Sequence, residues 1–142
     1  MRLSMQTDFA LRALMYLAGQ KGDQPVSTAV IAKSYGISHS HLQKAVHELR
    51  RLGYLKSSPG RNGGLQLASP SASVRIGTLV AKLEDTGRMV DCKRGPCPLA
   101  GACLLKLALD RAERSFYEAL DGFTLADVTK GKTLNALQKM IA

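Results

Sequence analysis

Apolar residues recur every three or four positions in several segments of the chain, which is the spacing of an amphipathic helix. In residues 8–19, for example, Leu11, Leu14 and Leu17 fall on one face, and Thr7 precedes them as a candidate N-cap. The same pattern predicts helices over residues 8–19, 28–34, 39–52, 76–84, 103–121 and 123–128. Residues from Gly131 onward show no clear pattern, and we expect this tail to be partly mobile.

Two of these helices are separated by a tight turn over residues 35–38, in which Gly36 can adopt a positive φ. Ser38 is the candidate N-cap of helix 39–52, which places Leu42 and Leu49 on one face and polar side chains on the other. Two helices joined in this way form the helix-turn-helix pattern, whose second helix contacts DNA bases through its N-terminal residues.

A short hairpin follows directly. Residues 54–57 and 65–67 are predicted strands, and the turn between them contains three glycines with Arg61 and Asn62. The sequence therefore predicts a mainly α fold, a winged helix-turn-helix with a small β-hairpin wing. The candidate DNA-binding residues are Ser38, His39, Ser40, His41, Gln43 and Lys44 on the helix and Arg61, Asn62 and Gly63 on the wing. The alternative is that the helix residues form a solvated polar face and that the glycines serve only the turn.

The net charge of +9 and the pI near 9.8 favour an anionic partner such as nucleic acid. Residues 1–67 hold nine Lys and Arg against three Asp and Glu, so this half carries +6 of the excess. The chain has no run of eighteen apolar residues, so no membrane span is predicted. Asp8 and Arg12 interrupt the first apolar run, so the N-terminus does not resemble a signal peptide. We therefore expect a cytoplasmic protein that does not contact a membrane.

The second half of the chain carries the longest predicted helix, residues 103–121. Its stripe of Leu105, Leu109, Phe116 and Leu120 is broad enough to form a subunit interface, although packing within one chain would produce the same pattern. We divide the sequence into a DNA-binding region, residues 1–75, and a region of residues 76–142 that holds a cysteine loop (86–103) and this dimerisation helix. The two regions are expected to pack as one compact unit.

All three cysteines of the chain, Cys92, Cys97 and Cys103, lie within twelve residues on a stretch interrupted by glycine and proline. Such a cluster is typical of a metal site, an iron–sulfur site or a redox switch, and an odd number of cysteines disfavours a closed set of disulfides. Tetrahedral iron or zinc takes four donors, so three thiolates need a fourth ligand from elsewhere.

Taken together, the motifs resemble those of the small winged-helix repressors that include NsrR, IscR and RirA, over nearly the whole chain. The likeness lies in residues 1–3, 7–14, 35–38, 52–55 and 60–65, and in the three-cysteine loop. IscR-like members have a histidine shortly after the third cysteine, where this chain has Lys106. NsrR-like members use an aspartate near the start of the first helix, and Asp8 occupies that place, whereas RirA-like members tend to have asparagine. The resemblance is therefore to the NsrR type.

This resemblance implies a homodimeric repressor, not an enzyme, that binds double-stranded operator DNA and senses nitric oxide. It implies an iron–sulfur cluster, [4Fe–4S] rather than [2Fe–2S], held by Cys92, Cys97 and Cys103 with Asp8 of the partner subunit. A carboxylate is a harder and more labile ligand than a thiolate, so the iron that it binds would be the reactive one. Without the resemblance, the simpler interpretation of Asp8 is that its negative charge interacts favourably with the positive N-terminal end of the helix dipole.

Three alternatives use the same residues differently. The first is a repressor on the same scaffold that holds zinc or acts as a thiol switch, and the second is a repressor that responds to iron instead of nitric oxide. The third is an enzyme or electron carrier. An enzyme or electron carrier is disfavoured because the sequence shows no acid–base constellation, and the wing glycines do not match a phosphate-binding loop.

Overall fold

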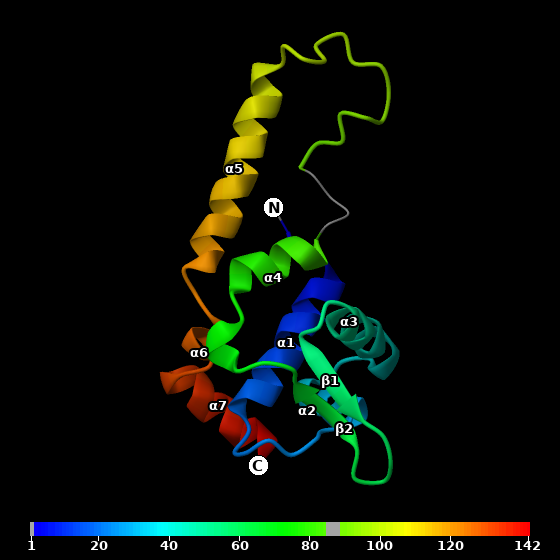
Figure 1. Ribbon diagram of the computed structural model, residues 1–142, viewed down its shortest axis with the longest axis vertical. Coiled ribbons are helices and arrows are strands. Elements are labelled where there is room, and N and C mark those ends of the chain that lie inside the picture. Colours follow the sequence, from blue (N-terminus) through cyan, green and yellow to red (C-terminus); the bar gives the residue numbers. More distant parts are fainter. Residues whose placement is uncertain (1, 85–88) are drawn as a thin grey trace.

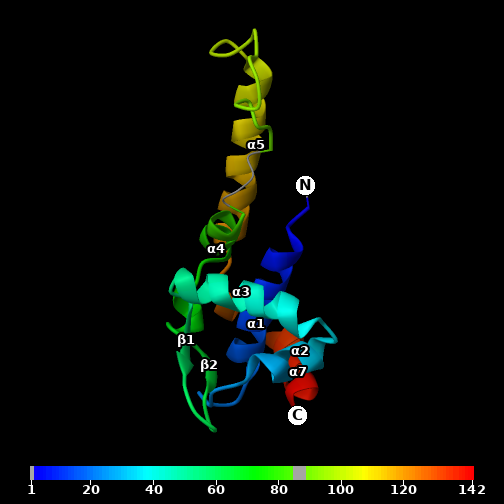
Figure 2. The same cartoon turned by 90° about the vertical axis from the view of Figure 1, so that its right-hand side faces the viewer.

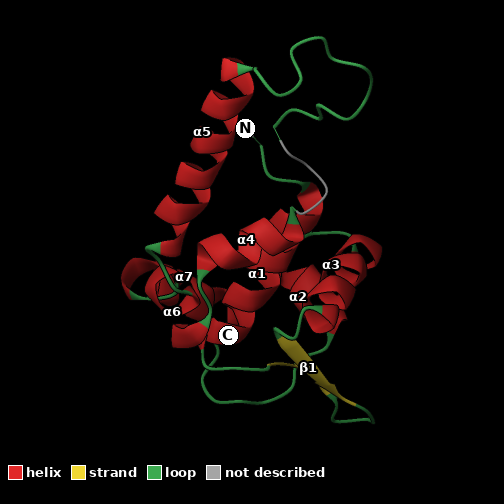
Figure 3. Cartoon of the chain, turned by 45° about the horizontal axis from the view of Figure 1, so that its top comes forward, coloured by secondary structure: helices red, strands yellow, loops and turns green. Residues whose placement is uncertain are grey.

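The computed structural model describes residues 2–84 and 89–142, and it is mainly helical with a single two-stranded hairpin in the described part (Figure 3). This confirms the predicted winged-helix fold class. The elements are α1 (Met5–Gly19), α2 (Thr28–Tyr35), α3 (His39–Arg51), β1 (Leu55–Ser58), β2 (Gly64–Leu67), a 3-10 turn (Ser71–Ser73), α4 (Ile76–Leu83), α5 (Leu104–Asp121), α6 (Leu125–Val128) and α7 (Gly131–Ile141). The predicted start of the cysteine loop, residues 86–88, lies outside the described residues.

Helix α1 begins one turn earlier than predicted. Its N-cap is Ser4, whose hydroxyl accepts a hydrogen bond from the Thr7 backbone N–H at 3.1 Å. The prediction that Thr7 caps the helix is wrong, because Thr7 lies inside the first turn and is fully buried. Asp8 keeps its place in the first turn, where a negative charge is favourable.

Helices α2 and α3 form the predicted helix-turn-helix. Gly36 ends α2 in the left-handed conformation with φ 63°, and its N–H and that of Ile37 return to carbonyls of the last turn of α2. Leu42 and Leu49 of α3 are fully buried against α1 and α2. Ser38 precedes α3, but its hydroxyl meets that of Ser40 at 3.0 Å instead of capping the helix.

The hairpin packs on the same core. Strands β1 and β2 pair antiparallel, with Leu55 opposite Leu67, and Leu65 is buried where its backbone also pairs with Val26 ahead of α2. Figure 2 shows α3 lying across the molecule with the hairpin at one end of it. The wing is therefore held to the helix-turn-helix by backbone hydrogen bonds as well as by apolar side chains.

Helix α5 is fixed at its C-terminal end. The Asp121 carboxylate accepts hydrogen bonds from the Thr78 N–H at 2.6 Å and from the Thr78 hydroxyl at 2.9 Å, at the start of α4. Gly77 lets the two helices approach closely, because a Cβ there would lie 2.0 Å from the Tyr117 carbonyl oxygen. From this base, α5 projects away from the other helices and carries the cysteine loop at its far end (Figure 1).

The C-terminal residues form a helix, contrary to the expectation of a mobile tail. A capping box between Thr124 and Asp127 starts α6, and α7 then packs on α1. Leu137 of α7 is buried against Gly19, where a Cβ would lie 2.9 Å from the Leu137 Cβ. Across the described residues, none of the helices combines the length and the apolar character needed to cross a membrane.

Candidate functional site

The first turn of α3 presents polar side chains to solvent. His39, Ser40 and His41 are all exposed, as are Gln43 and Lys44 one turn further on. The opposite face of the same helix is buried in the core, so the polar face is fixed in its orientation by Leu42 and Leu49. This arrangement suits insertion of the N-terminal half of α3 into a major groove, where side chains reach the base edges.

The wing tip presents two further candidates. Arg61 and Asn62 are exposed, whereas the role of Gly63 is structural. A Cβ at position 63 would lie 2.1 Å from the Ser58 carbonyl oxygen, and the Gly63 N–H closes the turn by donating to Gly60 O at 3.0 Å. Gly63 is thus required by the turn itself, which leaves Arg61 as the cationic group of the tip.

A groove of about 450 Å³ separates α3 from the wing, and sequence reasoning did not anticipate most of its lining. Hydroxyl groups from the start of α2 and from β1 meet His47 and Arg50 of α3 there. Its polar side chains are Ser27, Thr28, Gln43, His47, Arg50, Ser57 and Ser58. Hydroxyls, an arginine and the N-terminus of α2 form a set that suits a phosphate of a DNA backbone. The sequence held only one sign of this groove, the serines in segments that are far apart in the chain and come together only in the folded structure.

The C-terminal end of α3 is basic but partly neutralised. Arg51 forms an ion pair with Glu48 at 2.5 Å, and the hydrogen bond from Arg51 lowers the pKa of the Glu48 carboxyl. Arg50 lies one residue earlier and faces the groove. Of these two arginines, Arg50 is the one placed to contact a phosphate.

The cysteine loop stands in solvent. All residues from 89 to 102 are exposed, and Cys103 is partly buried at the N-terminus of α5, where its sulfur accepts a hydrogen bond from the Lys106 N–H at 3.4 Å. Cys92, Cys97 and Cys103 are free thiols. Within the described ranges, no three groups of the His, Cys, Asp or Glu type lie close enough to hold a metal ion. One chain alone therefore does not bring the predicted ligands together.

The donor set nevertheless fits an iron–sulfur cluster. Three unpaired soft thiols lie on one short segment, and thiolates are the preferred ligands of iron in such clusters. Gly95 has open space around it, and Gly101 has a φ of 88°, so neither position obstructs a rearrangement of the loop backbone. Lys93 and Arg94 add positive charge beside Cys92, which suits a site that holds an anionic group.

Asp8, the predicted fourth ligand, lies on the surface of α1. Its carboxylate is half-exposed and accepts hydrogen bonds from Arg12, at 2.9 Å from Nη2 and 3.1 Å from Nε. The same guanidinium lies 5.8 Å from the ring centroid of Tyr35, the last residue of α2. Burial raises the pKa of the Tyr35 hydroxyl, and the Arg12 charge partly opposes this shift. Asp8 is thus accessible to another chain and connected through Arg12 to the helix-turn-helix.

The projecting half of α5 leaves large apolar side chains in water. Leu104 is 80% exposed, Leu105 68% and Leu107 54%. Leu105 continues the stripe that reaches Phe116 and Leu120, and these two residues pack on the core at the base of the helix. A single chain therefore covers only the base of the stripe.

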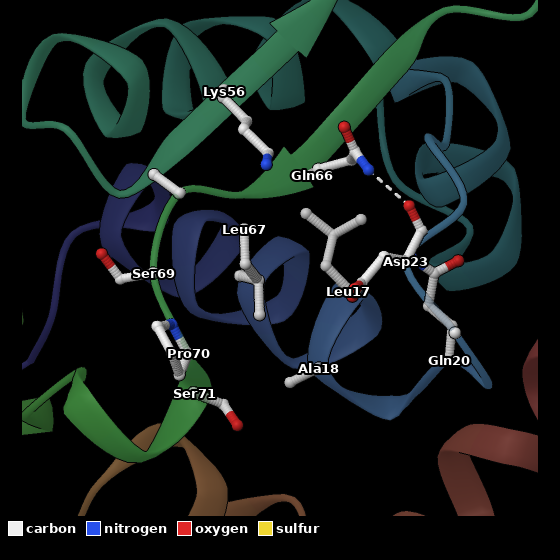
Figure 4. A pocket seen from close by; sticks show the side chains of 12 residues that line it. Leu17, Ala18, Gln20, Asp23, Lys56, Gln66, Leu67, Ser69, Pro70 and Ser71 are labelled. Atoms are coloured by element: carbon white, nitrogen blue, oxygen red, sulfur yellow. Dashed lines mark hydrogen bonds between the residues drawn. The ribbon is translucent and has the colours of Figure 1, made fainter.

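A separate polar pocket of about 490 Å³ lies behind the wing and contains none of the predicted site residues (Figure 4). Lys56 and Gln66, opposite one another on β1 and β2, face Leu17 and Ala18 of α1 there. The Gln66 amide donates a hydrogen bond to the Asp23 carbonyl oxygen. This hydrogen bond attaches β2 to the loop that follows α1.

Comparison with known proteins agrees with this architecture. Residues 3–131 match the model of the family described as Rrf2, iron-dependent transcriptional regulator. The chain is 43% identical over 135 residues to the HTH-type transcriptional repressor NsrR of Streptomyces coelicolor, a match that covers 94% of this chain and 91% of that protein.

Solved structures show the same fold. The T. potens IscR structure matches with a TM-score of 0.71 at 26% identity, covering 90% of this chain and 85% of that one. CymR, the global cysteine regulator of B. subtilis, matches with a TM-score of 0.70 at 27% identity, covering 90% of this chain and 95% of that one.

Proposed function

Because the chain belongs to the Rrf2 family of transcriptional repressors and is of the NsrR type, we propose that it binds operator DNA as a homodimer and releases it when nitric oxide removes an iron–sulfur cluster. The observation that carries this proposal is the position of the three free thiols. They lie on an exposed loop at the end of a projecting helix whose apolar face has no partner within the described chain.

In this proposal, each protomer reads one half-site. The N-terminal half of α3 enters the major groove, the groove beside Arg50 and Ser57 receives a backbone phosphate, and Arg61 at the wing tip approaches the minor groove. The exposure of these side chains and the net charge of +9 support this docking.

A second copy of the chain covers the projecting half of α5. Burial of one leucine stabilises an interface by about 1.5–3 kcal/mol. Leu105 and Leu109 lie on the stripe, so a symmetric dimer buries each of them twice. This pairing would also bring the loop of one protomer toward the surface of the other, where Asp8 is accessible.

Cys92, Cys97 and Cys103 would hold the cluster, for which we propose the [4Fe–4S] type, with Asp8 of the partner subunit as the fourth ligand. When bound, the cluster supplies iron that reacts with nitric oxide. Cys103 is already fixed at the N-terminus of α5, so Cys92 and Cys97 are the thiols that must move to converge on it. Lys93 and Arg94 offset the negative charge of the thiolates.

Asp8 has two alternative partners in this scheme. In the structure it is held by Arg12, an exposed i,i+4 ion pair that contributes only about 0.5 kcal/mol. Its transfer to a metal therefore costs little. Arg12, released from Asp8, remains beside Tyr35 at the end of α2, so the state of Asp8 affects the contact between α1 and the helix-turn-helix.

The test is anaerobic reconstitution with iron and sulfide, followed by absorbance, native mass and operator binding before and after nitric oxide. We expect a coloured dimer that loses about 100-fold in operator affinity, equivalent to about 2.7 kcal/mol. Cys97→Ser should abolish the colour, and Asp8→Ala should alter cluster stability or operator binding. Asp23→Ala, which removes another exposed carboxylate, is the control. A colourless anaerobic protein with full operator affinity would refute the proposal.

A zinc or thiol repressor on the same scaffold is the second candidate, because Cys92 and Cys97 are exposed free thiols. Analysis for iron, sulfide and zinc separates these possibilities. A graded response to iron starvation in the absence of nitric oxide would instead indicate an iron sensor.

A further inference from the structure

An aromatic contact joins the start of α1 to the DNA-reading end of α3. The rings of Phe9 and His41 are stacked with an interplanar angle of 24° and a centroid separation of 6.5 Å, within the range of offset aromatic pairs. Phe9 directly follows Asp8 in the chain, and His41 lies in the first turn of α3. The contact therefore connects the residue next to the proposed cluster ligand with a proposed DNA-binding residue.

Phe9 is anchored, whereas His41 is not. Phe9 is half-buried and packs against the core beside Ala10, which is fully buried. His41 is exposed, and its side chain makes no hydrogen bond or ion pair with any of the residues that the structure describes. The phenyl ring is thus the specific contact that orients the imidazole. An imidazole lying against another ring keeps its two nitrogens at its edge, free to meet a base or a phosphate.

The surroundings of the contact allow it to change. A small, mostly apolar pocket of about 180 Å³ lies beside the two rings and is lined also by Met5, Gln6 and Lys44. Met5 is largely exposed, and all three side chains are long and flexible. The pocket and its flexible neighbours therefore leave room for the His41 ring to move off the phenyl ring without disturbing the fully buried residues of α1.

We propose that Phe9 is a positioning residue for DNA recognition. It holds the His41 ring in its reading orientation, and because it follows Asp8 it makes that orientation depend on the position of α1. This inference rests on the proposed function. It assigns to Phe9 no contact with DNA or cluster of its own.

The test compares Phe9→Leu, which keeps apolar bulk but removes the ring, with Phe9→Tyr, which keeps the ring. The probe is a labelled duplex selected from a random pool by the cluster-loaded wild-type protein, and binding is followed by fluorescence anisotropy. We expect Phe9→Leu to weaken binding about tenfold and Phe9→Tyr to restore it to within about twofold. Phe123→Leu, which makes the same change at an exposed phenylalanine far along the chain beside α6, is the control and should have no effect.

The decisive readout is non-additivity. In a protein that already carries His41→Ala, Phe9→Leu should cause no further loss, because the ring it positions is gone. Equal tenfold losses in both backgrounds, or equal binding by Phe9→Leu and wild type, would overturn the proposal. If Phe9→Leu does not fold, Phe9→Met replaces it in the same cycle. Failure of the proposed function is distinguishable, because it appears in the wild type as equal affinity with and without the cluster.

Discussion

The helix-turn-helix unit and the end formed by α5 and the cysteine loop differ in how far the chain itself buries their side chains. The unit formed by α1, α2, α3 and the hairpin has fully buried residues in each of its three helices. By contrast, every residue from 89 to 102 is exposed, and no residue of α5 is fully buried. The first unit, which we call the reading unit, is completed by apolar side chains of the same chain. In our proposal, a second chain and a bound group complete the other end, the cysteine loop with α5. This difference suits the proposed sensor, because the part that would change is the part that the chain alone leaves exposed.

The largest expected effect tests the self-sufficiency of the reading unit. Leu49→Ala should lower the free energy of unfolding of the apo protein by about 3 kcal/mol, because Leu49 is fully buried in α3. Leu99→Ala, the same substitution in the loop, should change it by less than about 0.5 kcal/mol. Urea unfolding followed by circular dichroism measures both. Comparable losses would show that the two ends are not distinct.

The second effect tests the dependence of α5 on a partner. Leu105→Glu places a charge on the stripe and should weaken dimerisation about 100-fold, about 2.7 kcal/mol, as measured by analytical ultracentrifugation. Leu107→Glu is the matched control, since Leu107 is also exposed but lies off the stripe. If the two variants dimerise equally well, the stripe is not the interface.

The third effect concerns the junction between the two ends. Gly77→Ala inserts a methyl group 2.0 Å from the Tyr117 carbonyl and should cost about 2 kcal/mol by forcing α4 and α5 apart. Gly95→Ala, in the loop, meets no atom within 4 Å and should be neutral in the apo protein. Thermal unfolding of both variants checks this, and an unaffected Gly77→Ala protein would contradict the tight junction.

The smallest effect is a dependence on pH. Glu84, at the end of α4, accepts a hydrogen bond from the Ser4 N–H at 2.8 Å. Burial opposes its ionisation, but this bond and one from the Thr7 hydroxyl outweigh burial and hold its pKa below the ordinary 4.5. A lowered pKa stabilises the fold above that ordinary value, and the contribution disappears as the pH falls through the folded value.

Melting temperatures of wild type and Glu84→Gln should therefore differ slightly at pH 7 and converge in acid. Glu118→Gln, at an exposed position of α5, is the control. A difference that persists unchanged at low pH would assign the effect to packing instead of charge.

The sequence predicted what local pattern determines. The helix-turn-helix and the wing follow from periodicity, from Gly36 and from the glycine-rich turn, and the structure agrees with them. Ser4 was missed as the cap because Thr7 is also a good capping residue by type. Only the structure shows that Thr7 is buried in the core and that Ser4 caps the helix. Helix α7 was missed because its place is set by the packing of Leu137 on Gly19, which no local signal shows.

The candidate site divides in the same way. The three thiols and the polar face of α3 could be named from the sequence, since each set lies on one short segment. The groove beside the wing could not, because Ser27 and Ser57 approach Arg50 only after folding. The pairing of Asp8 with Arg12 is local in sequence, but its link to Tyr35 again depends on how α1 packs against α2.

The attachment of Asp121 to Thr78 makes α5 a lever with a fixed fulcrum. Its 18 residues span about 27 Å at about 1.5 Å per residue. A tilt of about 5° at the base would therefore carry Cys103 through roughly 2 Å, about the length of a metal–sulfur bond. Small rotations at the junction with α4 are thus magnified to the scale on which ligands are gained or lost.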